Sequence, residues 1–200
     1  MKWTVLVVAV LISLVMPARA QTTFSPDAEG FIRNWLVLAP IRMVGESGAD
    51  EMHFDALNGE ANVKPRPDAR FLVGGQPMPW TPHQTQGYFI DFRESFDREL
   101  GEHAIGYAVT YVHADTAMNV TLALGTNDQG KAWFNGKEVM SHEEARVLSK
   151  DENRIPVSLV QGQNVLVLKV INEVNSWQAC ARFLNGETPV TGLKISLTPQ

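Results

Sequence analysis

Trp80 and Trp177 are the residues of this chain whose type and surroundings best fit the binding of a ligand. A carbohydrate is held through an aromatic plane, which contacts the apolar face of a sugar ring, and through polar side chains, which bond to its hydroxyl groups. Trp80 stands among prolines, and Trp177 follows the polar stretch 172–176. We therefore predict a carbohydrate-binding site with these ligand-binding residues: Trp177, Trp80, Asn172, Asn175, Arg182, Asp128 and His113.

Each aromatic residue also has a structural interpretation. Trp177 is either a stacking platform or a core residue, and Trp80 is either an exposed platform or the anchor of a flap. We assign Trp133, in a strand beside a turn, to the core. His113 and Asp115 lie at i and i+2, on one side of a strand, where a surface hydrogen bond is the alternative to a binding role. Because the core uses the faces of strands, we expect the site in loops at one end of the fold.

The sequence offers little for metal binding or catalysis. Its five histidines include no His-x-His or His-x-x-x-His pair, so we predict no metal site. The loop 126–129 has oxygen ligands for Ca²⁺ but few carboxylates; we interpret it as a plain hairpin loop, with a structural Ca²⁺ as the alternative. The acid-rich run 91–102 is either the carboxylate pair of a glycoside hydrolase or a solvated connection. We predict no catalytic residues, no enzymatic activity and no cofactor.

The strongest local signal is the dipeptide Asn135-Gly136. Asn-Gly fits the two positive-φ positions of a type I′ turn, so residues 131–134 and 137–140 are predicted to pair as a hairpin. The stretch 125–130, rich in Gly, Thr, Asn and Asp, is predicted to be a loop.

Short apolar stretches separated by Gly and Asn turns fill the rest of the chain. The spacing predicts strands over 31–41 (stopped by Pro40), 88–92, 104–112, 154–160, 164–171, 177–184 and 193–197. Residues 154–160 and 164–171 are expected to form a hairpin around 161–163, and the apolar pattern of 164–171, broken by Lys169, predicts a central strand.

Between the first two strands, the proline-rich segment 42–86 is predicted to be mostly loop, with a short helix around 50–57. A long irregular insertion of this kind either packs as a flap or carries a site. Strands at this spacing, without a long amphipathic helix, indicate an all-β fold. We predict an antiparallel β-sandwich with a long irregular N-terminal insertion.

Residues 1–20 have the composition of a signal peptide, with Lys2, an apolar run over 5–16 and Ala18-Arg19-Ala20. The apolar run is shorter than the roughly 20 residues that a transmembrane helix needs. We expect a single domain over 21–200 in a secreted or periplasmic bacterial protein, without a membrane span after signal removal. Removal of residues 1–20 takes away Lys2 and Arg19 and changes the net charge from −5 to −7 (−5 − 2). A negative net charge disfavours nucleic acid as a partner.

Cys180 is the only cysteine of the chain, so no intramolecular disulfide can form. It lies in an apolar strand pattern, where a thiol behaves as a small hydrophobic group. We predict that Cys180 is buried and unreactive.

Several segments occur in an order that matches a known family: WLVLAPI, GYAVTYVHAD, LGTNDQGKAWFNGKEV, RIPVSLVQGQNVLVLKV and WQACARF. They resemble the galactose-binding-domain-like jelly rolls, which are similar to carbohydrate-binding modules and occur in secreted bacterial proteins and beside glycoside hydrolases. A Trp-x-Asn-Gly turn and an Asn-x-Leu-x-Leu-Lys-Val strand recur in that family. The resemblance covers 88–183 best and implies a jelly-roll fold. The family includes sugar binders, protein-interaction modules and inert spacers.

Three functions fit these observations. The first is a non-catalytic carbohydrate-binding module whose partner is a glycan. The second is a structural or protein-interaction domain of an envelope or secreted assembly, whose partner is a protein. The third is a small hydrolase that uses the acid-rich run with His103 or His113. An exposed aromatic platform in a concave loop cluster distinguishes the first function from the second.

Overall fold

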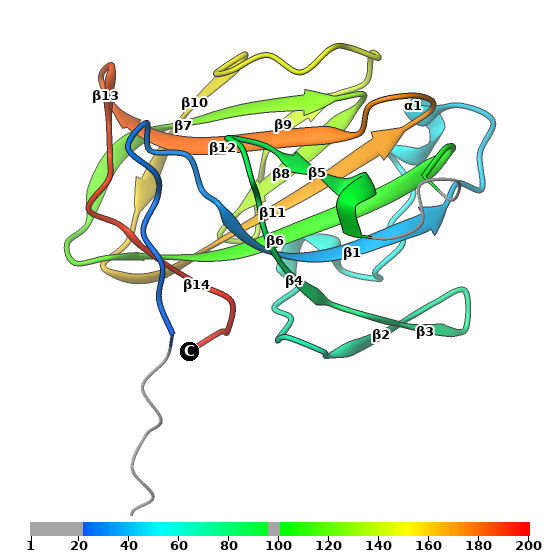
Figure 1. Ribbon diagram of the computed structural model, residues 1–200, viewed down its shortest axis with the longest axis horizontal. Coiled ribbons are helices and arrows are strands. Elements are labelled where there is room, and N and C mark those ends of the chain that lie inside the picture. The colour runs from blue at the N-terminus through cyan, green and yellow to red at the C-terminus, as the bar shows by residue number, and fades with distance from the viewer. Residues whose placement is uncertain (1–21, 96–100) are drawn as a thin grey trace, which may run out of the picture.

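The computed structural model describes residues 22–95 and 101–200, which form two antiparallel β-sheets packed face to face (Figure 1). The all-β antiparallel sandwich predicted from the strand spacing is confirmed. The predicted signal peptide lies outside the described residues, and the single domain over 21–200 stays a prediction. Within the described residues, no helix is long and apolar enough to cross a membrane.

The larger sheet, sheet A, has the strand order β4-β1-β6-β11-β8-β9, and β14 also pairs with β6. Its strands are β1 (Asn34–Arg42), β4 (Thr81–Gln84), β6 (Ala104–Ala114), β8 (Gly130–Phe134), β9 (Lys137–His142), β11 (Gly162–Asn172) and β14 (Lys194–Ser196). Strand β11 lies between β6 and β8, so its predicted central position is confirmed.

The smaller sheet, sheet B, has the order β10-β7-β12-β13, and β5 pairs with β12. Its strands are β5 (Ile90–Asp91), β7 (Met118–Asn127), β10 (Asn153–Leu159), β12 (Gln178–Asn185) and β13 (Thr188–Pro189). A separate hairpin joins β2 (Arg70–Val73) to β3 (Gln76–Pro79), and the helices are α1 (Gly48–Glu51), η1 (Glu60–Asn62) and η2 (Phe92–Ser95).

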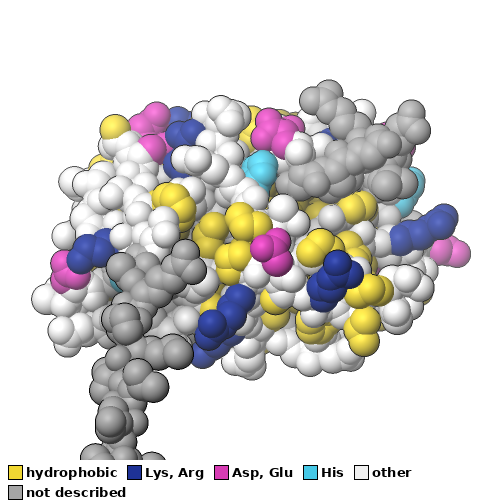
Figure 2. All heavy atoms as spheres, turned by 60° about the horizontal axis from the view of Figure 1, so that its bottom comes forward, with side chains coloured by type: hydrophobic (Ala, Val, Ile, Leu, Met, Phe, Trp, Pro, Cys, Tyr) yellow, Lys and Arg dark blue, Asp and Glu magenta, His cyan; other side chains and the backbone are white. Residues whose placement is uncertain are grey.

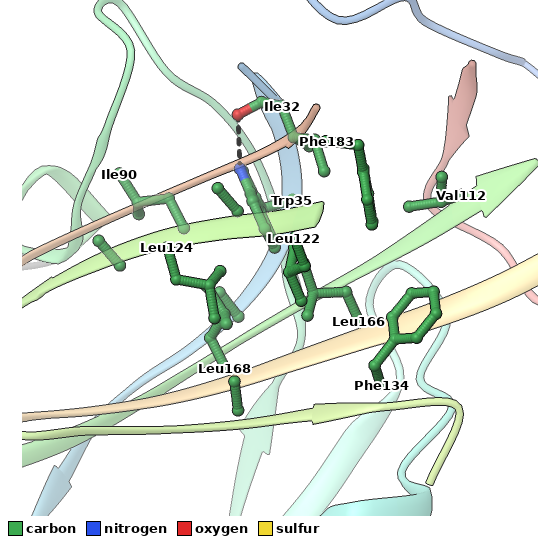
Figure 3. Close-up of a cluster of buried hydrophobic side chains, with 14 of the residues drawn as sticks. Ile32, Trp35, Ile90, Val112, Leu122, Leu124, Phe134, Leu166, Leu168 and Phe183 are labelled. Carbon is green, nitrogen blue, oxygen red and sulfur yellow. Dashed lines mark hydrogen bonds between the residues drawn. The ribbon is translucent and has the colours of Figure 1, made fainter. Parts of the chain in front are cut away.

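The main core fills the space between the two sheets. Alternate residues of β7 and β11 point into it, among them Leu122 from sheet B and Leu166 from sheet A (Figure 3). Trp35 from β1 is also buried there, and its indole Nε1 donates a hydrogen bond to the carbonyl of Ile32 at 3.0 Å. Burial of alternating side chains on both inner faces fixes the register of the strands, because a one-residue slip would expose them.

A second core lies on the outer face of sheet A, under the segment 43–85 (cyan to teal in Figure 1). Side chains of β6, including Tyr107, meet Met52, Leu57 and Trp80 from this segment. The predicted insertion is therefore a flap that covers one sheet. Its helix α1 begins earlier and is shorter than the predicted helix over 50–57, and its strands β2, β3 and β4 were not predicted.

The predicted hairpin at Asn135-Gly136 is confirmed. Strands β8 and β9 pair directly across the turn, where Asn135 has φ 51° and Gly136 has φ 80°. The loop predicted over 125–130 is wrong in extent, because β7 continues through Asn127 and leaves a much shorter connection to β8. Pairing of β7 with β12 as far as Gln178 supports this extension.

Two other strand predictions were wrong in detail. Strands β10 and β11 do not form a hairpin: β10 pairs with β7 in sheet B, whereas β11 pairs with β6 and β8 in sheet A. The short connection around Gly162 therefore crosses between sheets. Pro40 does not stop β1, which continues to Arg42 through a register shift between Leu38 and Ile41.

Cys180 is buried, as predicted, with 1% of its surface exposed. It pairs with Gly125 of β7, at whose position an added Cβ would lie 2.1 Å from the carbonyl oxygen of Ser149. The loop after β9 thus closes over this part of sheet B. Burial raises the pKa of the Cys180 thiol to about 12.

Candidate functional site

A cleft of about 440 Å³ opens between the edges of the two sheets. Strand β9 borders it on sheet A and strand β10 on sheet B, and the start of β7 and the β8–β9 turn complete it. Its volume is within the range of sites that bind small molecules. The lining residues are Asn119, Val120, Phe134, Asn135, Lys137, Val139, Pro156, Val157 and Ser158.

Two asparagines hold the turn that forms one wall of this edge cleft. The Asn135 amide Nδ2 donates to Asn164 Oδ1 at 2.9 Å, and the backbone N–H of Val165 donates to Asn135 Oδ1 at 2.8 Å. Asn164 is fully buried, and its Oδ1 also accepts from the backbone N–H of Val160 at 2.9 Å. Asn164 therefore joins the β8–β9 turn to the connection between β10 and β11.

The floor of the edge cleft is apolar. Phe134 is buried and packs against Phe183 of sheet B with 5.8 Å between ring centroids; Figure 3 shows both rings in the main core. Val120 and Val157 extend the floor from β7 and β10. A floor that belongs to the main core is rigid, so the cleft does not depend on a mobile loop for its shape.

The rim of the edge cleft is polar and exposed. Ser158 Oγ donates to Asn119 Oδ1 at 2.7 Å across the β7–β10 pair. Asn135 and Lys137 stand on the opposite wall. Hydroxyl, amide and ammonium groups above an apolar floor suit a ligand that has hydroxyl groups and an apolar ring face.

The site predicted from sequence lies elsewhere, and its proposed aromatic platform is not exposed. Trp177 is fully buried, and its Nε1 donates to the carbonyl of Val170 at 3.1 Å. Its ring stacks on Phe92 at 5.1 Å between centroids. Gly106 leaves room for the indole, since an added Cβ would lie 2.6 Å from it. The prediction that Trp177 presents a stacking face is therefore wrong, and its alternative assignment to the core is correct.

Trp80 is 1% exposed and belongs to the second core. Its backbone N–H donates to Ala69 and its carbonyl accepts from Asp68, both at 2.9 Å. Trp80 thus anchors the flap, and the prediction of an exposed platform at this residue is wrong as well. Trp133 is buried in the second core, as predicted.

Asp128, Asn172 and Asn175 lie at the end of the sandwich where α1 sits; each has at least one atom bonded to the protein, while the buried Asn172 Oδ1 has no hydrogen-bond partner within the described residues. The backbone N–H of Glu173 donates to Asp128 Oδ2 at 3.1 Å, and burial raises the pKa of Asp128. Asn172 is fully buried and donates to the carbonyl of Gly101. Asn175 is exposed, and its carbonyl accepts from Arg93.

Arg182 lies on β12 and forms an ion pair with Asp151. Its Nε donates to Asp151 Oδ1 at 2.8 Å, and its guanidinium lies 4.7 Å from the ring centroid of Phe31. The carboxylate of Asp151 raises the pKa of Arg182. This side chain has protein partners and is separate from both Asn172 and the edge cleft.

His113 lies far from Asn172, so the prediction that the two share one end is wrong. On the paired strands, His113 faces Gln163 whereas Asn172 faces Ala104. Nine residues of β6 separate these positions, roughly 30 Å at about 3.3 Å per residue. His113 Nε2 lies 2.8 Å from Ser196 Oγ, and Asp115 pairs with Lys194. Burial lowers the pKa of His113.

The loop 126–129 and the acid-rich run give no assembled centre within the described residues. No group of three His, Cys, Asp or Glu side chains in that part of the chain is arranged to hold a metal ion. In the acid-rich run, Asp91 accepts from the backbone N–H of Arg93, and Asp97 and Glu99 lie outside the described residues. The expectations for Ca²⁺ and catalysis stay untested.

A buried ionic group under the flap was not predicted. Lys169 Nζ lies 3.4 Å from Glu60 Oε2, which also accepts from the Tyr107 hydroxyl at 2.6 Å. Burial lowers the pKa of Lys169 and raises the pKa of Glu60. The only signal in the sequence was the lysine that interrupts an apolar strand. Because both charges are enclosed, we interpret the group as a link between the flap and sheet A.

The fold and the edge cleft define a β-sandwich with an open, mixed polar and apolar cleft. Neither a protein-family model nor a curated protein sequence matches this chain. Solved structures with a similar arrangement include a Ruminococcus gnavus β-glucuronidase (15% identity, TM-score 0.41), a Faecalibacterium prausnitzii β-glucuronidase (16%, 0.39) and the PA14 domain of the MpAFP antifreeze protein (11%, 0.42).

These three similarities cover 94%, 80% and 88% of this chain. They cover 30% and 23% of the two β-glucuronidases and 96% of the PA14 domain. This chain therefore spans less than a third of the length of either enzyme. Similarity at this level carries no conclusion about activity.

Proposed function

We propose that this chain is a non-catalytic carbohydrate-binding module of the galactose-binding-like jelly-roll type, and that the edge cleft is its glycan site. The observation that carries the proposal is the cleft itself: a cavity of suitable volume with a buried apolar floor beneath a rim of amide and hydroxyl groups. Export to the periplasm or the medium, expected from residues 1–20, would bring the site to extracellular glycans.

The lining of the edge cleft favours binding over hydrolysis. Glycoside hydrolysis requires two carboxyl groups on either side of the scissile bond. Among the described residues that line the cleft, none is Asp, Glu or His. The polar groups Asn119 and Ser158 already bond to each other at 2.7 Å, which holds both in place before a ligand arrives.

A glycan array followed by calorimetry tests this proposal. The mature chain 21–200 is screened against oligosaccharides from plant, bacterial and animal sources, and the best binder is titrated. The double variant Asn119→Ala/Ser158→Ala removes the polar pair and is expected to weaken binding about tenfold or more. Ser176→Ala, an exposed serine near Trp177, is the matched control and should bind as tightly as the parent. Equal affinity of all three proteins would refute the edge cleft as the site.

A protein-interaction domain is the second candidate, and the β2–β3 hairpin favours it. Figure 2 shows the face that carries this hairpin, where hydrophobic side chains reach the surface among Lys and Arg. Leu72 is 65% exposed and pairs with the exposed Pro77. If no glycan binds, a protein partner becomes the better proposal.

A further inference from the structure

Lys137 is the one charged side chain among the residues that line the edge cleft. It is exposed, and it has no ion pair or side-chain hydrogen bond with the described residues. The nearby Lys131 differs, because its Nζ lies 3.5 Å from Glu138 Oε2 and 5.8 Å from the Trp133 ring centroid. Lys137 thus presents an unpaired positive charge to whatever occupies the cleft.

The surroundings of Lys137 do not supply a counter-ion. The lining groups that share the cleft with it are neutral: Asn119, Asn135, Ser158 and the apolar floor. The next residue on β9, Glu138, pairs with Lys131. A neutral ligand that covered Lys137 would remove water from the ammonium group without replacing its interactions, which is unfavourable. A carboxylate on the ligand would replace them with a charge-assisted hydrogen bond.

We propose that the edge cleft prefers acidic glycans, in which a hexuronic acid residue places its carboxylate against Lys137. This inference rests on the proposed function and adds the class of sugar. Asn119, Asn135 and Ser158 have hydrogen-bond donors and acceptors for the ring hydroxyls of that residue, and Phe134 with Val157 forms the apolar floor beneath it.

Calorimetry with matched sugars tests the preference. The probes are trimers of galacturonic and of glucuronic acid and the same trimers after reduction of their carboxyl groups to alcohols. The acidic trimers are expected to bind about fivefold more tightly than the reduced ones, the upper range for an exposed charge pair. Lys137→Gln should abolish this difference and Lys137→Arg should keep it. Each variant should retain the melting temperature of the parent, because Lys137 is exposed.

Lys64→Gln is the control for net charge, since Lys64 is also exposed but lies outside the edge cleft. It should keep the fivefold preference. Equal binding of acidic and reduced trimers would overturn the proposal but leave glycan binding intact. Equal loss of the preference in Lys64→Gln and Lys137→Gln would also overturn it, because the effect would then come from overall charge. Binding of no glycan by the parent would overturn this proposal together with the proposed function.

Discussion

The two ends of the sandwich carry similar polar residues, but they use them differently. At the end near α1, Asp128 and Asn172 bond to nearby backbone groups, and Trp177 fills the core. At the opposite end, Asn119, Lys137 and Ser158 stand on the rim of the edge cleft, between strand β9 of sheet A and strand β10 of sheet B. At the first end these side chains are bonded to the backbone, whereas at the second end Asn119 and Ser158 bond to each other on the rim of the cleft and Lys137 has no partner among the described residues. Residue type alone therefore does not identify a candidate site, because the pairing of the strands decides where each residue lies.

The largest expected effect is at the end near α1. Trp177→Ala should reduce the free energy of unfolding by about 3–5 kcal/mol, because it opens a cavity where the indole stacks on Phe92. Urea denaturation measures the change. A loss below about 1 kcal/mol would mean that Trp177 is not a core residue. At partial denaturation the variant should still bind glycan in proportion to its folded fraction.

At the end with the edge cleft, a substitution of Asn164 tests how far one buried polar side chain stabilises the protein. Asn164→Ala should reduce the free energy of unfolding by about 2–3 kcal/mol, since it leaves the buried carbonyl of Val112, the part-buried N–H and carbonyl of Val160 and the Asn135 amide without this partner. Because Asn135 lines the edge cleft, glycan affinity should fall as well, even in conditions where the variant is fully folded. Unchanged affinity in the folded variant would show that the asparagine pair does not position the cleft.

Gly136→Val should have a smaller effect, about 1–2 kcal/mol of unfolding free energy. A β-branched residue would have to adopt the positive φ of 80°, and its Cβ would lie 2.6 Å from Asn62 Oδ1 of the flap. Gly136→Asn is the matched variant, because Asn tolerates positive φ but still adds the Cβ. A larger loss for Val than for Asn assigns the effect to the backbone; equal losses assign it to the contact with the flap.

The smallest expected effect is the reaction of the Cys180 thiol with a labelling reagent in the native protein. Burial raises the pKa of its thiol to about 12, so at pH 8 almost none of it is the reactive thiolate. Ellman's reagent should label the native protein slowly and the urea-unfolded protein rapidly, to one thiol per chain. Rapid labelling without denaturant would show that the loop after β9 opens from sheet B.

Much of the fold could be predicted because its signals are local. Asn135-Gly136 specifies a turn through its φ angles, and the alternation in β6 and β11 specifies which side chains face each core. The assignment of each strand to one of the two sheets could not be predicted from such local signals. The connection at Gly162 looks like a hairpin turn, but β10 and β11 pair with different neighbours, and those pairings are set by contacts distant in sequence.

The candidate site could not be predicted for the same reason. Asn119, Lys137 and Ser158 come from three strands, and only contacts between segments distant in sequence bring them to one cleft. Trp177 follows a polar stretch, which favoured an exposed platform, yet a polar loop can cover a buried indole, as the one before Trp177 does. Trp80 shows the same outcome, since prolines around it build the flap that encloses it.

The most direct test of the difference between the two ends is an NMR titration. The best-binding glycan is added to ¹⁵N-labelled protein, and the amide chemical shifts are recorded at each step. The signals of Asn119, Asn135, Lys137 and Ser158 should move in a saturable manner, while those of residues 172–177 stay in place. Shifts confined to 172–177 would contradict the assignment of the glycan site to the edge cleft.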